Sequence, residues 1–326
     1  MLLGTAWRGV AEMRWARFAF RRSGRLLVSL WVMITATFLM IHLIPGDPIR
    51  ASLGLDAPQA LVEARRTALG LDQPLLIQYF AYFTKLLTGD WGVSLATGEP
   101  VFGILAARLP GTLQLALPAF VLVIAVAVPL GLAMAALTRA GRRRRTELAF
   151  TSSSIVLEAI PGFLLAVGLV YVFGVTLGWV PVAGRSEPSS YIVPVVALAA
   201  APTAILARIM RIETLAVLQS DFIRTARAKR LGPARLYLRH ALPNAATATL
   251  TVSGLLLGAM IAGTVLIENV VAWPGLGSVM VASIIAKNYP VVQGTVLIFG
   301  ALILLINVVV DILLATLDPR SSILED

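Results

Sequence analysis

Residues that could perform acid–base, nucleophilic or metal chemistry are scarce in this chain of 326 residues. It has no cysteine, and its two histidines, His42 and His240, stand far apart in the sequence. Thiol nucleophiles, cysteine metal sites and histidine clusters are therefore excluded. Neither the H-E-x-x-H pair of a zinc protease nor the G-x-S-x-G turn of a serine hydrolase occurs. We expect the chain to carry no catalytic residues and to bind no metal or cofactor.

The elements that must position any functional residue are apolar. The chain is 58% hydrophobic and only 13% charged, whereas about a quarter of a soluble domain is charged. A helix needs about 20 apolar residues to cross a bilayer. Six stretches qualify, at residues 26–44, 113–137, 148–177, 191–212, 247–267 and 295–317. The predicted fold class is all-α, a polytopic membrane protein with six transmembrane helices.

Acidic side chains within these stretches are candidates for function, because ionisable groups are costly in a membrane. Glu158 precedes a proline–glycine pair in the third stretch, which we expect to be kinked there. It either lines a translocation path or pairs with a polar group on a neighbouring helix. Glu268 and Asn269, at the end of the fifth stretch, are further candidates for the path, and an interfacial position is the alternative for both.

The distribution of positive charge predicts the orientation. Arginines cluster before the first apolar stretch, after the second and after the fourth, whereas residues 45–111 carry mixed charge. By the positive-inside rule both termini are cytoplasmic, so the basic clusters do not require nucleic acid as a partner. The predicted order is a cytoplasmic arm (1–25), a first transmembrane helix (26–44), an extracytoplasmic segment (45–111), a five-helix core (112–317) with a cytoplasmic loop (213–246), and a cytoplasmic tail (318–326).

Three non-membrane segments have recognisable patterns. The arm mixes tryptophan and phenylalanine with six arginines, which is typical of a helix lying on membrane lipid; alternatively, translation starts at Met13. Glycines and prolines divide the extracytoplasmic segment into short helices. That segment is either a packed cap or a docking surface for an external partner, with Asp72, Gln73, Asp90 and Trp91 as candidate contacts.

The cytoplasmic loop predicts a helix, a turn and a second short helix. Ser220 or Asp221 can cap the first helix, which we expect to run for about three turns to Leu231. Gly232 then provides the bend, and the following proline suits the start of a second helix over 234–242. This loop either docks on a protein partner or is a solvated basic segment attracted to anionic lipid.

The same loop resembles the EAA signature of bacterial ABC-importer permeases, in the version of the dipeptide/oligopeptide/nickel class. The matching stretches are DFIRTARAKRL at 221–231 and RHALPN at 239–244. Further markers follow in the order of that class's first permease subunit: IPGDP at 44–48, LGLDQP at 69–74, GDWG at 89–92, LPGTL at 109–113, GWVP at 178–181, WPGLG at 273–277 and DPR at 318–320.

The resemblance implies a permease in a bacterial cytoplasmic membrane that imports di- or oligopeptides by alternating access. Nickel chelates and glutathione-like molecules are alternative substrates within the class. The implied partners are a second permease, two cytoplasmic ATPase subunits that use ATP and Mg²⁺, and an extracytoplasmic substrate-binding protein. The loop would be the ATPase-coupling site, made by Phe222, Ile223, Arg224, Thr225, Ala226, Arg227, Ala228, Lys229 and Gly232.

Two departures and one rival interpretation accompany this resemblance. The glycine usual in the loop signature is replaced by Arg230, and the N-terminal arm is long for the family. The rival is an ion-coupled secondary carrier, a class that often shows internal repeats and broken helices. The sequence shows no second copy of any marker, and the chain also lacks a G-x-x-x-x-G-K-[ST] phosphate loop of its own.

Overall fold

The structure, a computed structural model, describes residues 23–40, 42, 48–53, 57–68 and 70–317. The expected arm, most of the IPGDP motif and the tail lie outside these residues. The described part is helical throughout except for connecting turns and one isolated bridge between Val93 and Pro100. An all-α fold is therefore confirmed.

Within the residues that the structure describes, five helices are long and apolar enough to cross a membrane: Ser23–Met40, Val101–Gly141, Pro188–Val217, Pro233–Val270 and Tyr289–Leu314. A sixth span is formed only if Arg144–Ala159 and Gly162–Thr176 are taken together, and these two helices meet at an angle of 92°. Pro161 sits at the break, where its missing N–H and its ring end the preceding helix. The predicted kink in the third stretch is thus a sharp bend.

The chain divides into two compact units, which are described separately. The first unit contains the first helix, α2 (Pro48–Leu53), α3 (Gln59–Ala68), α4 (Leu75–Leu87) and the first half of α13 (Tyr289–Leu317). Tyr79 of α4 shares a 2.9 Å hydrogen bond with Thr35 of the first helix. Gln293 of α13 donates to the Thr37 carbonyl oxygen at 2.8 Å. Helix α4, in the segment predicted to be extracytoplasmic, therefore packs against the first helix, which also contacts α13.

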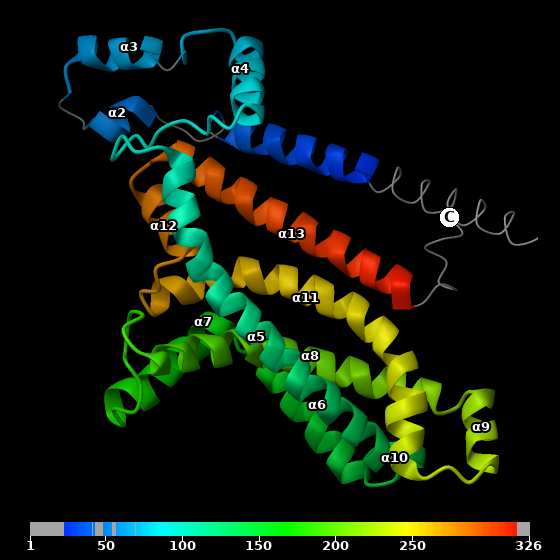
Figure 1. Cartoon of the computed structure of the whole chain (residues 1–326). Helices are drawn as coiled ribbons and strands as arrows, with labels where there is room; N and C mark the ends of the chain where they lie inside the picture. The colour runs from blue at the N-terminus through cyan, green and yellow to red at the C-terminus, as the bar shows by residue number, and fades with distance from the viewer. Residues whose placement is uncertain (1–22, 41, 43–47, 54–56, 69, 318–326) are drawn as a thin grey trace, which may run out of the picture. The chain divides into compact units, whose positions relative to one another are not determined.

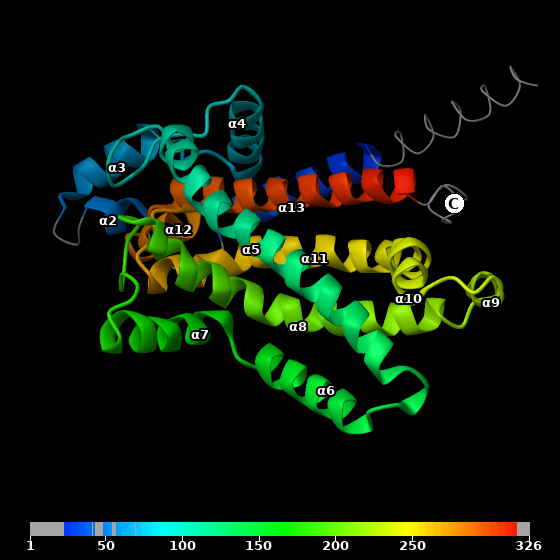
Figure 2. The same cartoon turned by 60° about the horizontal axis from the view of Figure 1, so that its bottom comes forward.

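The second unit contains most of α5 (Val101–Thr138), together with α6 (Arg144–Ala159), α7 (Gly162–Leu169), α8 (Ile192–Val217) and α11 (Leu242–Val270). Helix α8 packs against α6, α7 and α11 (Figure 1, Figure 2). Small residues make the contacts, among them Ala119 and Ala127 of α5 and Ala207 of α8, all fully buried. Small side chains let membrane helices approach closely.

One boundary differs from the sequence prediction. Helix α5 begins at Val101, whereas the apolar stretch was predicted from residue 113. The part of the helix before residue 113 is about one third of its length. Its internal prolines, Pro110, Pro118 and Pro129, do not end it, because neighbouring groups in a membrane protein can satisfy the freed backbone carbonyls. The last residues assigned to the extracytoplasmic segment are therefore part of the second long helix.

Candidate functional site

The loop after α8 folds as a short amphipathic helix, α9 (Asp221–Ala228), beyond the end of α8 and beside α10 (Pro233–Arg235; Figure 1). It has eight residues, so it is about a turn shorter than predicted. Ser220 occupies the N-cap position, but its hydroxyl donates to the Val217 carbonyl oxygen at 2.7 Å and does not cap the helix. An exposed ion pair joins Asp221 to Arg224.

The bend that ends α9 lies at Arg230, and the predicted bend at Gly232 is wrong. Arg230 has φ of +56°, the left-handed conformation that favours glycine. Its N–H donates to the Arg227 carbonyl at 2.8 Å, and the Leu231 N–H donates to the Ala226 carbonyl at 3.3 Å. These are the two bonds of a Schellman motif. Gly232 is extended, with φ of −62°, and lies at the N-cap of α10.

The two faces of α9 have different environments. Ile223 and Ala226 are buried against Leu218, Leu236 and Ala241 of the same chain. Ala226, one of the residues predicted for the coupling site, is therefore packed against side chains of its own chain. The outward face carries these exposed residues of the predicted coupling site: Phe222, Arg224, Thr225, Ala228 and Lys229.

Arg227 lies between these two faces and ties α9 to the end of α8. Its Nη2 donates to the Leu218 carbonyl oxygen at 3.0 Å. Burial and the neighbouring Arg139 guanidinium lower the pKa of Arg227 from its usual value, and Tyr237 acts in the opposite direction. Arg227 thus has a structural contact in addition to any contact with a partner.

The predicted second short helix is not a separate element. Helix α10 leads through a π-helical segment (η4, Leu236–Ala241) directly into α11, so that Pro233–Val270 is one continuous span. Pro233 does stand at the first helical position, as expected. The loop predicted at 213–246 is therefore α9 with its two connections, flanked by the ends of two long helices.

Glu268 is held inside the second unit by a polar network. Its side chain is fully buried, and its carboxylate accepts the Thr112 hydroxyl at 2.7 Å and the Ser278 N–H at 3.1 Å. Thr112 accepts in turn from the Leu276 N–H at 2.8 Å. This placement argues against Glu268 as a residue lining a path. Asn269 is exposed and donates to the Val265 carbonyl oxygen at 2.7 Å.

The network joins two of the motifs found in the sequence. Trp273, fully buried, donates through Nε1 to the Gly111 carbonyl oxygen at 2.9 Å. A Cβ at Gly111 would collide with the Pro274 carbonyl, and one at Gly275 would collide with the Glu268 carboxylate. The LPGTL and WPGLG segments are therefore interlocking parts of one joint between α5 and the turn after α11. Sequence reasoning missed Thr112, although its place in the LPGTL motif was a usable signal.

Glu158 pairs with a neighbouring helix. It lies in the last turn of α6 and forms an ion pair with Arg208 of α8. A second pair nearby joins Arg211 of α8 to Glu147 of α6 at 2.6 Å, and Arg211 also donates to the Thr138 hydroxyl at 3.0 Å. Of the two interpretations of Glu158, the structure supports the structural partner. The pairing arginines were interpreted from the sequence only as topology signals.

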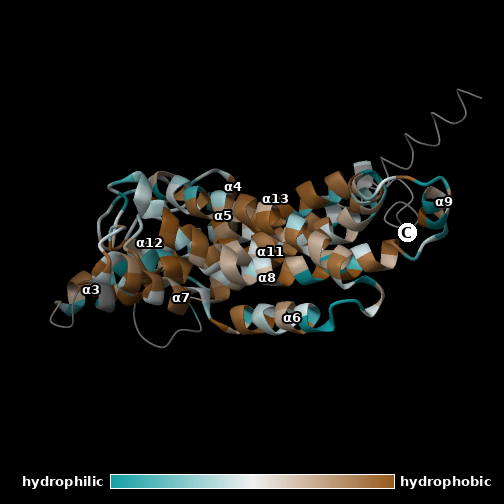
Figure 3. Ribbon diagram, turned by 90° about the horizontal axis from the view of Figure 1, so that it is seen from below, coloured by the Kyte–Doolittle hydropathy of each residue, from teal (hydrophilic) through white to brown (hydrophobic). Residues whose placement is uncertain are grey.

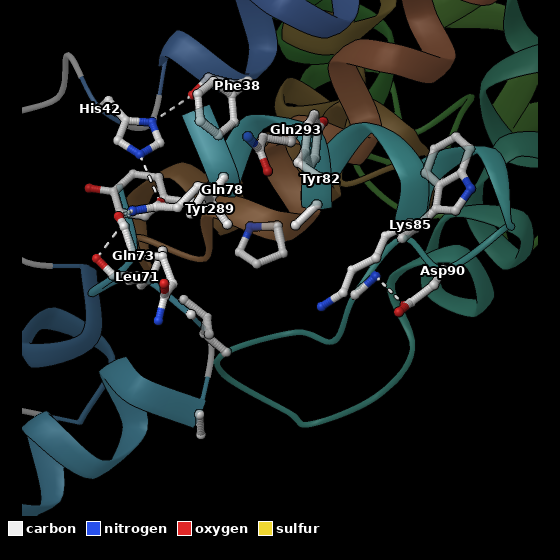
Figure 4. A pocket seen from close by; sticks show the side chains of 18 of the residues that line it. Phe38, His42, Leu71, Gln73, Gln78, Tyr82, Lys85, Asp90, Tyr289 and Gln293 are labelled. Carbon is white, nitrogen blue, oxygen red and sulfur yellow. Dashed lines mark hydrogen bonds between the residues drawn. The ribbon is translucent and has the colours of Figure 1, made fainter. Parts of the chain in front are cut away.

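A cavity of about 400 Å³ lies in the first unit, and three of the four predicted docking residues line it: Gln73, Asp90 and Trp91 (Figure 4). His42 also lines it, with Nδ1 3.0 Å from the Phe38 carbonyl oxygen and Nε2 3.2 Å from Gln78 Oε1. The histidine is therefore held by hydrogen bonds at both ring nitrogens. Across the residues that the structure describes, no three potential metal ligands come together.

Two family profiles cover most of the sequence. The profile described as "Binding-protein-dependent transport system inner membrane component" matches residues 127–323. A second, for the N-terminal part of such membrane components, matches residues 15–116. The chain belongs to this family. It is an ABC-importer permease, so the ion-coupled carrier is excluded as an alternative.

Curated relatives and solved structures agree with this membership. The permease is 36% identical over 302 residues to the glutathione transport system permease protein GsiC of Escherichia coli (strain K12), covering 93% of this chain and 97% of the relative. The GsiC of Salmonella choleraesuis is 35% identical over the same length. An inward-facing structure of the MetNI methionine ABC transporter matches with a TM-score of 0.57 and 18% identity, covering 66% of this chain and 97% of that chain.

The family defines the general setting of the permease. It is a multi-pass component of an inner membrane, and it works with ATPase and substrate-binding partners. The MetNI match shows a type I importer permease fold for the part of the chain that it covers.

Proposed function

We propose that this permease imports short peptides and that glutathione is its first candidate substrate. The observation that supports the substrate most directly is the 36% identity to glutathione permeases over nearly the whole length of both chains. Glutathione is itself a small peptide-like molecule, so this proposal narrows the di- and oligopeptide class implied by the sequence motifs. Nickel chelates remain a test substrate, because the same motifs are shared by that class.

We further propose that the exposed face of α9 couples the permease to an ATPase. Phe222 is 45% exposed on a helix whose other face is buried, which gives a partner groove one apolar anchor flanked by Arg224 and Lys229. ATP and Mg²⁺ would bind to the ATPase subunits, since the permease sequence contains no phosphate-binding loop. Closure of two ATPases would move two such helices together and reorient the spans.

In the proposed assembly this chain pairs with a second permease, two ATPases and an extracytoplasmic binding protein, with both of its termini in the cytoplasm. The docking surface for the binding protein would be the extracytoplasmic segment. Gln73, Asp90 and Trp91 support this because they share one cavity wall, and Asp72 adjoins them on the exposed turn before α4.

Uptake by the reconstituted importer tests the proposal. Vesicles containing both permeases and the ATPases, supplied with the binding protein, are loaded with ATP and given labelled glutathione, a dipeptide or a nickel chelate. We expect ATP-dependent uptake of glutathione, and none when the ATPase lacks its phosphate-loop lysine. Uptake of only the nickel chelate would overturn the substrate, and uptake driven by a proton gradient without ATP would overturn the coupling.

A further inference from the structure

An apolar groove runs along α5 where it meets the start of α11. It has a volume of about 300 Å³ and is lined almost entirely by carbon atoms. Its walls come from Val128, Leu132 and Ala136 on α5 and from Leu238 and Leu242 on the other side. Leu238 is 58% exposed, so the groove opens at the surface of the described chain.

Positive charge gathers at one end of this groove. Arg139 follows Ala136 by three residues and begins the 3-10 turn (Arg139–Gly141) that continues α5, about one turn beyond the groove. Arg227 follows Ala226, which is buried in the cluster against which the groove residue Tyr237 packs. Besides burial, the neighbouring Arg139 guanidinium contributes to lowering the pKa of Arg227. The groove therefore ends at two guanidinium groups that lie close to one another.

These two cations lack an acidic partner within the described residues. The buried Nε of Arg227 has no hydrogen-bond acceptor, and its only bonded neighbour is the Leu218 carbonyl at Nη2. Among the ion pairs of the described residues, Glu147 pairs with Arg211 and Asp221 pairs with Arg224, and none joins an acid to Arg139 or Arg227. A buried charged donor without an acceptor is costly. An anion from outside this part of the chain would satisfy this donor and compensate the two charges.

We propose that the groove and the two arginines form a binding site for one anionic phospholipid. An acyl chain fills the apolar groove, and the headgroup phosphate accepts hydrogen bonds from Arg139 and Arg227. A lipid satisfies both halves of the site at once, whereas a free phosphate would leave the groove empty and a neutral lipid would leave the guanidinium pair uncompensated. The inference rests on one part of the proposed function, namely that this end of α5 lies at a membrane surface.

Native mass spectrometry of the purified importer complex tests this site. The probes are phosphatidylglycerol, phosphatidylcholine with the same acyl chains, and inorganic phosphate. We expect one phosphatidylglycerol to bind in preference to phosphatidylcholine. Each arginine replaced by glutamine, in Arg139→Gln and Arg227→Gln, should weaken that binding by about fivefold and leave phosphatidylcholine unaffected. Ala133→Phe should weaken both lipids, because Ala133 is an exposed groove residue on α5.

Matched controls separate the site from general basicity and bulk. Arg142→Gln removes an exposed arginine of the same basic run, and Ala125→Phe adds the same ring to an exposed α5 position outside the groove; both should bind lipid like the unaltered protein.

Equal binding of the two lipids, or displacement of phosphatidylglycerol by inorganic phosphate, would overturn the proposal. So would lipid binding that emerges only after the ATPases are removed, since the arginines would then belong to that interface. The measurement does not depend on transport, so an importer that fails in uptake can still show the lipid site.

Discussion

Arg230 holds a backbone conformation for which glycine is the better residue. An L-residue at positive φ costs about 1–2 kcal/mol, part of which glycine loses again through its greater freedom in the unfolded chain. We expect Arg230→Gly to stabilise the loop by up to about 1 kcal/mol and to raise the midpoint of thermal unfolding slightly. The control is Gly232→Val, which should be tolerated because Gly232 has an ordinary extended backbone. A clear fall in the unfolding midpoint with Arg230→Gly would show that the loop bends elsewhere.

Thr112 supplies the hydroxyl that links α5 to the turn after α11, because it donates to Glu268 and accepts from the Leu276 N–H. Thr112→Val keeps the shape of the side chain but leaves the Leu276 N–H without an acceptor and removes one donor from Glu268. We expect a loss of about 1–3 kcal/mol in the free energy of unfolding, measured by thermal or denaturant unfolding of the purified permease. Thr251→Val on an exposed face of α11 is the matched control and should change little. Equal effects of the two substitutions would contradict the network.

The role of a single residue could be predicted from the sequence where its type is unusual for its position, but not where it depends on a distant partner. Glu268 was recognisable as unusual because a carboxylate ends an apolar stretch. Its partner Thr112 lies 156 residues earlier. The LPGTL motif marks that threonine, but nothing in the motif shows that it meets Glu268. Similarly, the position of the bend could not be predicted from the loop sequence. Glycine favours positive φ, but the hydrogen bonds around Arg230 stabilise that conformation at an arginine.

Helix α9 has one face turned into the chain and one turned outward. Substitutions on the inner face should affect stability, and those on the outer face should affect ATPase binding. We expect Phe222→Ala to reduce the ATPase recovered with the purified permease while leaving the permease's unfolding midpoint unchanged, because Phe222 is exposed. Ala226→Trp should lower the unfolding midpoint itself, since overpacking a filled site costs about 1–3 kcal/mol. The experiment compares copurified ATPase and thermal unfolding for both variants. Normal ATPase recovery with Phe222→Ala would contradict the proposed docking face.

The ion pairs between α6 and α8 hold together two helices that are otherwise far apart in sequence. We expect Glu158→Lys to lower the unfolding midpoint and the additional change Arg208→Glu to restore most of it, because the reversed pair can form across the same contact. The control is the same reversal at Asp221 and Arg224, an exposed pair whose interaction is weak. A double reversal at Glu158 and Arg208 that is as unstable as the single change would show that the pair contributes no attraction.

At the level of elements, hydropathy located five long apolar helices, whereas the third predicted stretch is two helices that meet at 92°. The capping residues predicted the short helix after the fourth stretch. The start of α5 was misplaced because Pro110 and Gly111 resemble a helix stop in water, whereas here Gly111 packs against the Pro274 carbonyl. The second loop helix was predicted as separate because Pro233 marks a helix start and nothing in the sequence indicated that the helix would continue through a π-helical segment into α11.

The topology of the whole molecule can be tested directly because the chain has no cysteine. Single cysteines introduced by Ala57→Cys and Gly141→Cys are labelled in intact cells with a membrane-impermeant maleimide. We expect the label to reach position 57 from outside and position 141 only after the cells are opened, because the arginines that follow the second span are retained on the cytoplasmic side. Reaction of both positions from the same side would contradict the proposed orientation.

The distance between Glu158 and Arg208 along the chain has a consequence for biosynthesis. Helix α6 carries mixed polar and apolar residues along its length (Figure 3), and its acid precedes the neutralising arginine by 50 residues. At a synthesis rate of about 5–20 residues per second, the ribosome delivers Arg208 roughly 3 to 10 seconds after Glu158. During that interval the bent third span holds an unpaired carboxylate. We therefore expect stable integration of α6 to wait until α8 has left the ribosome, so that these two segments enter the membrane as a pair.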